Sequence, residues 1–240
     1  MNETLVILPC YNEAETAPGL IKKILENKKI DVLVVDDRSK DGTVEKIEGS
    51  IKNKRLTILV RSDRRSFANS EMDGFRFAIE KGYKNVVTMD ADGSHPPEYI
   101  DKLLSGLKEN DLIVGSRYMN GVSVVNWPIQ RIAISLFANF LARKMLRIEI
   151  SDLTSGFMAM KIDVPLNLEL CAIQTQGYGY LIEYKWRSTR AGFKVKESPI
   201  IFIERTKGQS KMSAKHAQEA FWMLCLLTIK ERFIGVSDNC

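Results

Sequence analysis

Short apolar runs alternate with longer amphipathic stretches along the first half of the chain. Strands are predicted for the apolar runs at residues 4–8, 31–36, 56–60, 85–89 and 111–114. Helices are predicted for the stretches between them, at residues 14–27, 43–50, 68–81 and 97–108. Strands that alternate with helices at this spacing favour a parallel sheet. We therefore expect an α/β fold, with a single Rossmann-like domain and a mostly parallel central sheet flanked by helices.

The regular alternation ends near residue 117. The later elements are expected in the order helix, loop, helix, strand and helix, at residues 127–147, 151–157, 178–191, 193–204 and 216–233. The longest apolar run, Ala220–Ile229, is about half the length that a bilayer span requires. The first and last of these helices remain open to two interpretations, because a broad apolar face suits either a membrane interface or a protein core.

Composition narrows the class of protein only slightly. Of the 240 residues, 45% are hydrophobic and 27% are charged, which is ordinary for a soluble globular protein. The net charge of +5 does not by itself indicate nucleic acid as a partner. Basic residues gather at 52–55, 61–65 and 207–215, where they form a solvated surface or attract phosphate or an anionic bilayer. The cysteines have no CxxC or metal-type spacing, which favours a reducing compartment.

Polar motifs follow four of the predicted strands. They are Pro9–Glu13, Asp36–Asp37, Asp90–Ser94 and Gly115–Tyr118. Pro9 is also expected to end the first strand. In open α/β sheets, ligands bind at the carboxyl ends of the strands. Four polar motifs at these positions therefore favour one shared pocket over four unrelated loops.

Asp90 and Asp92 are the most informative pair among these motifs. They follow the fourth predicted strand with one residue between them, and Gly93 comes next. A turn that contains glycine can curl both carboxylates into one pocket, although strand alternation would separate them. Two hard oxygen ligands there suit Mg²⁺ or Mn²⁺ and leave coordination positions for phosphate oxygens. The alternative is a turn with solvated aspartates.

Six segments in order carry a resemblance to a known family. They are Pro9–Glu15, Val35–Thr43, Met89–Asp92 with His95–Glu98, Gly115–Tyr118, Asp152–Phe157 and Arg205–Met212. With them the chain resembles the inverting family 2 glycosyltransferases of GT-A fold, and most closely the polyprenol-phosphate (dolichol-phosphate) mannosyltransferases. One departure is Ser66–Ser70, where the family usually has a glycine-rich stretch. The resemblance implies a catalytic domain over residues 1–215, followed by an amphipathic helix and tail over 216–240 without a transmembrane span.

The resemblance implies a metal and a nucleotide-sugar site. Asp92 would bind the metal directly, Asp90 would bind the metal or the sugar–ribose side, and Ser94 would reach the ion directly or through water. Tyr11 can stack on the base, and Glu13 or Asp37 can accept hydrogen bonds from base or ribose. The nucleotide-sugar site as a whole is expected to comprise Pro9, Tyr11, Glu13, Asp37, Asp90, Ala91 and Asp92. Two other acids have expected structural roles: Asp36 in a turn and Asp41 as a helix cap.

The resemblance also implies an anion clamp for the phosphate of a lipid acceptor. The residues expected to carry catalysis are Asp92, Arg117, Arg131, Arg205 and Lys211. Ser135 lies one helical turn after Arg131 and can add a hydroxyl donor to the acceptor site of Arg117 and Arg131. An ion pair at the protein surface is the alternative for each arginine.

No general base is expected, because a phosphate monoester is already anionic near neutral pH. Glu183 is expected to orient the sugar or to pair with Arg187, one helical turn further on. His95, which precedes two prolines, is expected to shape its loop, and His216 is a weak catalytic candidate.

The expected function is transfer of a hexose, first of all mannose from GDP-mannose, to a polyprenyl or dolichyl phosphate with Mg²⁺ or Mn²⁺. The alternatives are UDP-glucose or another nucleotide sugar as donor, a soluble glycan as acceptor, and a non-catalytic nucleotide-binding subunit. The expected partners are the nucleotide sugar, the lipid, and a membrane surface or a membrane-embedded subunit, but no nucleic acid. The expected location is cytoplasmic, at the cytoplasmic face of a membrane.

Overall fold

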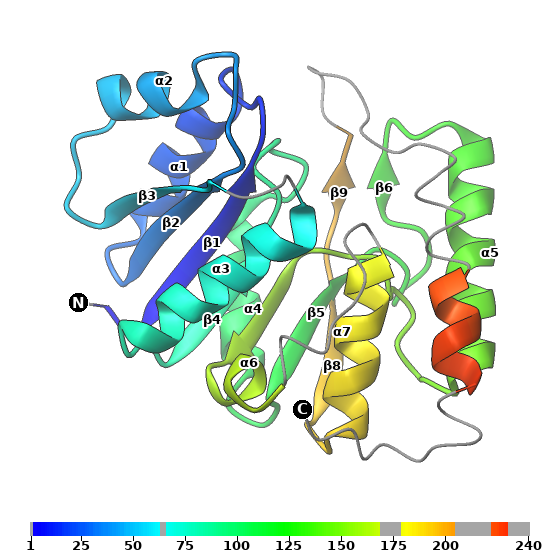
Figure 1. Cartoon of the computed structure of the whole chain (residues 1–240). Helices are drawn as coiled ribbons and strands as arrows, with labels where there is room; N and C mark the ends of the chain where they lie inside the picture. The colour runs from blue at the N-terminus through cyan, green and yellow to red at the C-terminus, as the bar shows by residue number, and fades with distance from the viewer. Residues whose placement is uncertain (1, 63–65, 169–178, 205–221, 230–240) are drawn as a thin grey trace.

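A mostly parallel sheet forms the centre of the molecule (Figure 1). The computed structural model describes residues 2–62, 66–168, 179–204 and 222–229. The strands of the large sheet are β1 (Thr4–Cys10), β2 (Ile30–Asp36), β3 (Leu56–Val60), β4 (Asn85–Thr88), β5 (Leu112–Ser116), β7 (Met158–Lys161) and β8 (Val195–Pro199). Their order is β3-β2-β1-β4-β7-β5-β8, and β7 runs antiparallel to both of its neighbours. The expected α/β fold is confirmed.

Helices connect and cover these strands. They are α1 (Ala17–Glu26), α2 (Thr43–Ser50), α3 (Phe67–Glu80), α4 (Ile100–Gly106) after a single 3₁₀ turn at Pro97–Tyr99, α5 (Ile129–Leu146), α6 (Asp163–Asn167) and α7 (Gly179–Arg190). Residues 222–229 form a further helix. A separate small sheet pairs β6 (Val124–Val125) with β9 (Phe202–Ile203). The single strand expected over 193–204 is therefore divided between two sheets.

The two faces of the large sheet bury different helices. Along β1, Leu5 and Ile7 belong to the hydrophobic cluster that includes α3 and α7. Val6 and Leu8 belong to the cluster that includes α1, α2 and α4. This alternation is what a strand buried on both faces requires. Helix α3 lies very close to β1, because a Cβ atom on Gly74 would stand only 2.5 Å from Ile7 Cγ2.

Pro9 does not end the first strand, which continues to Cys10. The carbonyl of Ile7 accepts a hydrogen bond from Met89 on the β4 side, and alternation directs Pro9 to that same side. The paired register with β4 ends at Ile7, whereas the register with β2 continues to Cys10. Pro9, which has no N–H, therefore faces β4 beyond the last hydrogen-bonded pair of β1 and β4, so no strand hydrogen bond is lost.

Helix α5 buries one face and exposes the other. Asn139, Ala142 and Leu146 are buried. Its exposed apolar side chains are Ile129, Ile134, Leu136, Phe137 and Phe140, and Phe137 is 65% exposed. The helix at 222–229 has the same division, with Met223, Leu224 and Leu227 buried in the cluster that contains Ala142 and Leu146, and Trp222, Leu226 and Ile229 exposed. Core packing therefore accounts for only one face of each helix.

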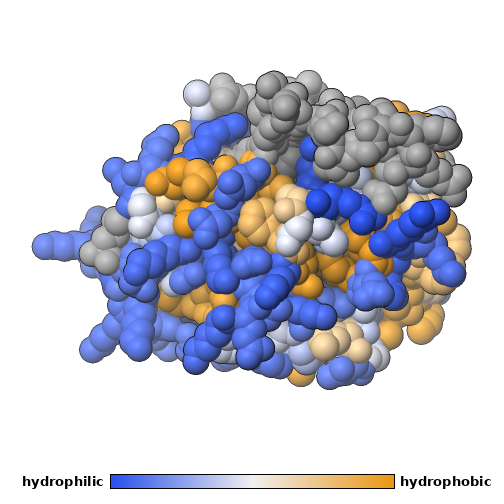
Figure 2. All heavy atoms as spheres, turned by 90° about the horizontal axis from the view of Figure 1, so that it is seen from below, coloured by the Kyte–Doolittle hydropathy of each residue, from blue (hydrophilic) through white to orange (hydrophobic). Residues whose placement is uncertain are grey.

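Hydrophobic side chains reach the right-hand edge of the molecule in Figure 2, the side on which Figure 1 places α5. Among the residues that the structure describes, no helix is both long enough and apolar enough to cross a bilayer. The predicted division at residue 215 lies in a part of the chain outside the described residues and stays a prediction.

Candidate active site

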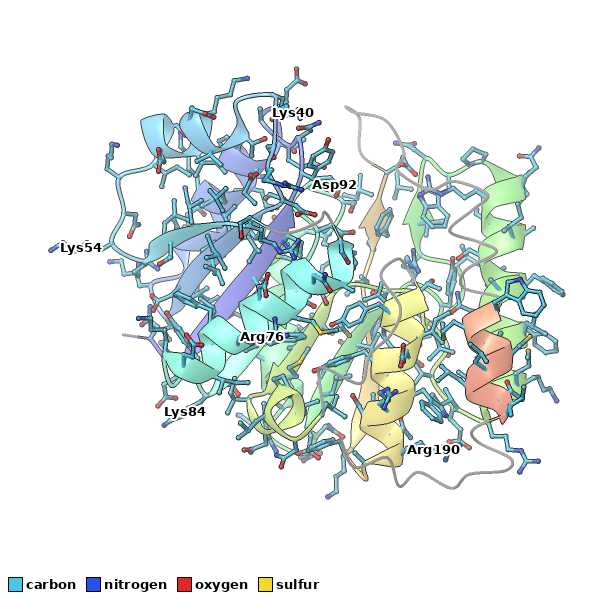
Figure 3. All side chains as sticks on the ribbon, viewed as in Figure 1. Lys40, Lys54, Arg76, Lys84, Asp92 and Arg190 are labelled. Carbon is cyan, nitrogen blue, oxygen red and sulfur yellow. The ribbon has the colours of Figure 1, made fainter. Side chains whose placement is uncertain are left out.

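The carboxyl ends of the parallel strands bring the polar motifs to one edge of the sheet. Figure 3 places Asp92 at the same end of the molecule as Lys40, whereas Lys84 and Arg190 lie at the opposite end. This edge is where α/β sheets of this kind bind ligands. The strand ends that carry the motifs therefore share one edge of the sheet, as expected, and the shared pocket stays a prediction.

The loops after β1 and β2 are tied to each other. The backbone N–H of Asn12 donates to Ser39 Oγ at 2.8 Å, and that of Glu13 donates to Thr43 Oγ1 at 3.0 Å. Asp41 accepts bonds from the backbone of Thr43 and, with its other oxygen, from Ala14. The N-cap of α2 is Gly42, so the expected cap role of Asp41 is wrong. Asp41 instead accepts the N–H of the first helical residue and also fixes the first loop. Pro9 near the end of β1, and Tyr11 and Glu13 in the loop that follows, are all partly exposed.

The two acids after β2 have different surroundings. Asp36 accepts hydrogen bonds from the backbone and the hydroxyl of Ser39, which is the turn role expected for it. Asp37 is buried and directs Oδ1 to Arg61 Nη1 and Oδ2 to the backbone N–H of Ser66, both at 2.8 Å. Ser66 is the N-cap of α3. Asp37 therefore anchors the segment that replaces the glycine-rich stretch, and its expected contact with base or ribose stays a prediction.

The loop after β4 orients both of its carboxylates. The left-handed backbone of Gly93, with φ of +80°, turns the chain sharply. Ser94 then donates to Asp92 Oδ1 through its backbone N–H at 3.0 Å and through its hydroxyl at 2.6 Å. The hydroxyl of Ser94 thus contacts Asp92, the expected metal ligand, and is shielded from solvent. Ala91 is buried between the two acids.

His95 fixes the backbone of the other acid, Asp90. Its Nδ1 accepts the backbone N–H of Asp90 at 3.1 Å, and its ring stacks on Phe157 with centroids 5.1 Å apart. Burial lowers the pKa of His95 to about 4, so the imidazole is neutral near pH 7 and Nδ1 can act as the acceptor. This is the loop-shaping role expected for His95. The side chain of Asp90 is 36% exposed.

The Asp90–Asp92 pair would need oxygens from a ligand to complete a metal site. Within the described parts of the chain, no group of three or more His, Cys, Asp or Glu side chains is arranged to hold an ion. Two carboxylates at a strand end still suit Mg²⁺ or Mn²⁺, because such ions often take few protein ligands and bind substrate phosphates and water.

Arg117 lies at the end of β5 in a buried ion pair. Its Nε and Nη2 donate to the two carboxylate oxygens of Asp152, both at 2.7 Å, and Nη2 also donates to Thr154 Oγ1 at 2.8 Å. The backbone N–H of Arg117 donates to Asp152 as well, at 3.0 Å. Arg117 is 7% exposed and Asp152 is fully buried. The guanidinium is therefore held in one orientation.

The structure brings Arg131 and Ser135 close to Arg117. The guanidinium carbons of Arg117 and Arg131 lie 5.3 and 4.0 Å from the ring centroid of Trp127. Arg131 also pairs with Glu204. Ser135 accepts a hydrogen bond from the hydroxyl of Tyr118 at 2.7 Å, and the Tyr118 ring lies 5.3 Å from the Arg117 guanidinium. These side chains form one cationic cluster around two aromatic rings.

Aromatic rings connect this cluster with the acidic loop. The ring of Phe202 lies 5.4 Å from that of Trp127, 5.4 Å from that of His95 and 5.5 Å from the Arg117 guanidinium. The backbone supports the same contact, because Ile203 donates its N–H to the carbonyl of Ser94 at 3.1 Å. The acidic loop and the cationic cluster are therefore two sides of one site.

The remaining predicted residues are only partly covered by the structure. Glu183 is buried on α7 and accepts a hydrogen bond from Arg187 Nε at 2.9 Å, which is the pairing expected as one of its two roles. Arg205, Lys211 and His216 lie outside the described residues. Their roles stay predictions.

The site contains residues that the sequence did not single out for a role. Asp152 belongs to a recognised motif, but nothing in its spacing predicted a pair with Arg117. Trp127 precedes a helix and gave no chemical signal. Lys185 lies between aromatic residues in α7, and no local pattern separates a buried lysine from one on a solvated helix face.

Comparisons with known proteins identify the family of this chain. The chain is 38% identical to the undecaprenyl-phosphate mannosyltransferase of Micrococcus luteus over 218 residues, which cover 90% of each protein. It is 36% identical to the polyprenol monophosphomannose synthase of Mycolicibacterium smegmatis, over 95% of this chain and 88% of that protein. It is 35% identical to the dolichol-phosphate mannosyltransferase of Pyrococcus furiosus, over 88% of this chain and 59% of that protein.

The fold is also similar to solved structures. The glucosyl-3-phosphoglycerate synthase of Mycobacterium tuberculosis, in complex with Mn²⁺, UDP and glucosyl-3-phosphoglycerate, matches 99% of this chain and 82% of that chain. The TM-score is 0.70 at 16% sequence identity. The model of the family described as glycosyl transferase family 2 matches residues 5–164. This chain therefore belongs to glycosyl transferase family 2.

Proposed function

We propose that this protein transfers mannose from GDP-mannose to the phosphate of a polyprenyl or dolichyl carrier lipid, with inversion at the anomeric carbon. The names of relatives that are 35–38% identical support this activity. The observation that carries the proposal is the contact between the two sides of the site. Phe202 touches both His95, which orients the acidic loop, and Arg117 in the cationic cluster.

The acidic side would hold the donor. Asp90 and Asp92 are the residues that would bind Mg²⁺ or Mn²⁺, with Ser94 keeping Asp92 oriented. When bound, the ion would stabilise the charge that develops on the leaving nucleoside diphosphate. The tied loops after β1 and β2 would form the edge for the nucleotide, with Tyr11 placed to stack on the base.

The cationic side would hold the acceptor. Guanidinium groups match phosphate oxygens, and Arg117 and Arg131 lie on the same aromatic ring with Ser135 close by. Among the described residues, none accepts a hydrogen bond from Arg117 Nη1, which leaves this nitrogen as the donor for an acceptor oxygen. Arg205 and Lys211 would complete the clamp.

The chemical step needs no protein base. An acceptor phosphate oxygen attacks the anomeric carbon of mannose, and the bond from that carbon to the diphosphate oxygen breaks. The electron pair leaves with GDP, and the products are GDP and mannosyl-phosphoryl-lipid. Glu183 is bonded to Arg187, so the structure supports an orienting or structural role for this carboxylate. The Arg117–Asp152 pair would set the direction from which the acceptor phosphate approaches the anomeric carbon.

The acceptor lipid implies contact with a membrane. We place that contact on the exposed apolar faces of α5 and of the helix at 222–229, which include Phe137 and Trp222. Basic residues in the last turn of α5, Arg143 and Lys144, would add attraction to anionic lipid. The same argument would place the protein peripherally at the cytoplasmic face, with residues 1–215 as the catalytic domain and 216–240 as its amphipathic end.

A transfer assay tests the proposal. Purified protein would be incubated with radiolabelled GDP-mannose, undecaprenyl or dolichyl phosphate in detergent, and Mg²⁺ or Mn²⁺. We expect label in the lipid fraction, and none after addition of EDTA. UDP-glucose and soluble glycans would be tested in parallel. A preference for UDP-glucose would show that it is the donor in place of GDP-mannose. Absence of transfer from every nucleotide sugar tested would refute an enzymatic role.

A further inference from the structure

One short loop, residues 152–156, connects the two sides of the site. At its start, Asp152 holds the guanidinium of Arg117. At its end, Gly156 lies against the acidic loop, because a Cβ atom built on it would stand 3.6 Å from Asp90 Oδ1. The carbonyl of Gly156 accepts a hydrogen bond from Thr88 Oγ1, in the last residue of β4, at 2.9 Å. A shift of this loop would therefore change the position of Arg117 relative to Asp90.

Side chains from other elements fix the loop. Glu197 of β8 accepts the backbone N–H groups of Ser151 at 2.8 Å and Asp152 at 3.0 Å. Asn139 of α5 accepts the backbone N–H of Leu153 at 2.8 Å. The backbone N–H groups of residues 151–153 thus bind side chains of distant elements, and strand pairing begins only at β7.

Lys185 of α7 donates hydrogen bonds to two backbone carbonyls of the loop. Its side chain is completely buried, and Nζ donates to the carbonyls of Leu153 at 3.0 Å and Ser155 at 2.7 Å. A third bond, at 3.3 Å, goes to the carbonyl of Leu181 within the helix. An ammonium group has three donors, and all of them are used here. The two loop carbonyls flank Thr154, which Arg117 contacts from the other side.

A buried lysine is a costly way to hold a loop. Lysine is almost never completely buried unless it is paired, and an apolar side chain of similar volume often gives equal or greater stability. The charges that face Lys185 are those of Asp152, Glu71, Arg117 and Glu197. Stability alone therefore does not explain this residue. What the lysine provides, and an apolar side chain would not, is a fixed position for two carbonyl groups.

We propose that Lys185 is a positioning residue for the transfer reaction, because it fixes the 152–156 loop and with it the placement of Arg117 relative to Asp90. The inference rests on the proposed function, in which Asp90 belongs to the donor side and Arg117 to the acceptor side. The phosphate oxygen must meet the anomeric carbon in line with the leaving group. A displacement of about 1 Å at such a step can cost on the order of a hundredfold in rate.

The test is the substitution Lys185→Met, which keeps an unbranched side chain, one heavy atom shorter, and removes the donors. We expect kcat for lipid mannosylation to fall roughly 10- to 100-fold, while KM for each substrate and the affinity for GDP with Mn²⁺ change less than about threefold. Hydrogen exchange should become faster at the amides of 152–156. Leu146→Ala, a core change at the end of α5, is the control for lost stability and should leave kcat unchanged at a temperature where the variant is folded.

A double-mutant cycle separates positioning from general damage. If Lys185 acts through the Arg117–Asp152 pair, Lys185→Met should reduce kcat by less than about threefold in an Asp152→Asn background. If the double variant lost kcat by the product of the two single-variant factors, the inference would be overturned. Unchanged exchange in the loop, or a loss that falls on KM alone, would also overturn it.

A milder variant covers the case in which Lys185→Met does not fold. Glu197→Gln removes one acceptor from the same loop at a partly exposed position. It should give the same loss of kcat without a change in KM, by roughly 3- to 10-fold, and unchanged kcat would overturn the inference. If the wild-type protein transfers no sugar at all, the proposed function fails, whereas the exchange measurement still decides whether Lys185 fixes the loop.

Discussion

Arg117 and Asp152 form a bidentate ion pair across 35 residues of sequence, with Nε–Oδ2 and Nη2–Oδ1 distances of 2.7 Å. Burial opposes the charge of both groups. The attraction between them outweighs this effect, so that the pKa of Arg117 is raised and that of Asp152 is lowered. Because the folded pKa of Asp152 lies below its unfolded value, the pair stabilises the fold above that unfolded pKa and loses this contribution as pH falls through the folded pKa.

We predict that Asp152→Asn reduces both stability and transfer. Removal of one partner leaves the guanidinium of Arg117 buried without its counter-ion, which typically costs about 3–5 kcal/mol. We expect kcat/KM for the lipid phosphate, corrected for the fraction of protein that is folded, to fall at least about tenfold. Denaturant unfolding and steady-state transfer would measure the two effects. Asp111→Asn is the control, because Asp111 pairs with Lys161 at the other end of β5. Equal activity in the two variants would contradict the prediction.

We predict that Asp92→Asn removes metal-dependent nucleotide binding and leaves the fold intact. An amide is a weaker ligand for Mg²⁺ or Mn²⁺, but it can still accept the two hydrogen bonds from Ser94. Calorimetric titration with GDP should show an affinity at least about tenfold weaker in the presence of Mn²⁺, and little change in EDTA. Asp101→Asn, at an exposed position of α4, should bind GDP like the wild type. Unchanged affinity in Asp92→Asn would refute the metal assignment.

We predict that Glu71→Gln stabilises the protein at alkaline pH. Burial raises the pKa of Glu71 to about 8, the charge of Asp90 adds to this effect, and Lys185 acts against it. Because the folded pKa lies above the unfolded value of about 4.5, the stabilisation is complete below pH 4.5 and is lost as pH rises through 8.

The free energy of unfolding of Glu71→Gln, compared with the wild type, should rise by on the order of 3 kcal/mol between pH 5 and 8. Urea denaturation at a series of pH values would measure it. Glu80→Gln is the matched control on the exposed side of α3. A constant difference across this range would show that Glu71 is ionised in the folded protein.

We predict that serine at Ile134 and Phe137 weakens membrane binding without loss of stability. These side chains are 67% and 65% exposed, so their replacement should change the free energy of unfolding by less than about 0.5 kcal/mol for each. If they enter the interface, loss of their apolar area should weaken binding to vesicles of phosphatidylcholine and phosphatidylglycerol at least tenfold. Cosedimentation would measure it. Val60→Ser, an exposed apolar position on β3, is the control and should bind normally. Equal binding by all the proteins would exclude α5 as the contact.

Local patterns sufficed for much of the fold. The apolar runs of β1, β2, β3 and β4 and the amphipathic stretches between them predicted a mostly parallel sheet. The signal is clearest for β1 and β2, which are buried on both faces, whereas β3 is a partly exposed edge strand. Local patterns did not predict β7 (Met158–Lys161), because its neighbours in the sheet, β4 and β5, lie far from it in the sequence. Such a strand is identified by its partners more than by its own residues.

By itself the sequence determined the α/β class, the strand ends that carry the motifs, and the acids and arginines expected at the site. The tertiary structure alone decided their partners: Asp152 for Arg117, Arg61 for Asp37, and the loop carbonyls for Lys185. The physical reason is that side-chain type and spacing fix what a residue can bind. Which group it meets depends on contacts between elements that lie far apart in the chain.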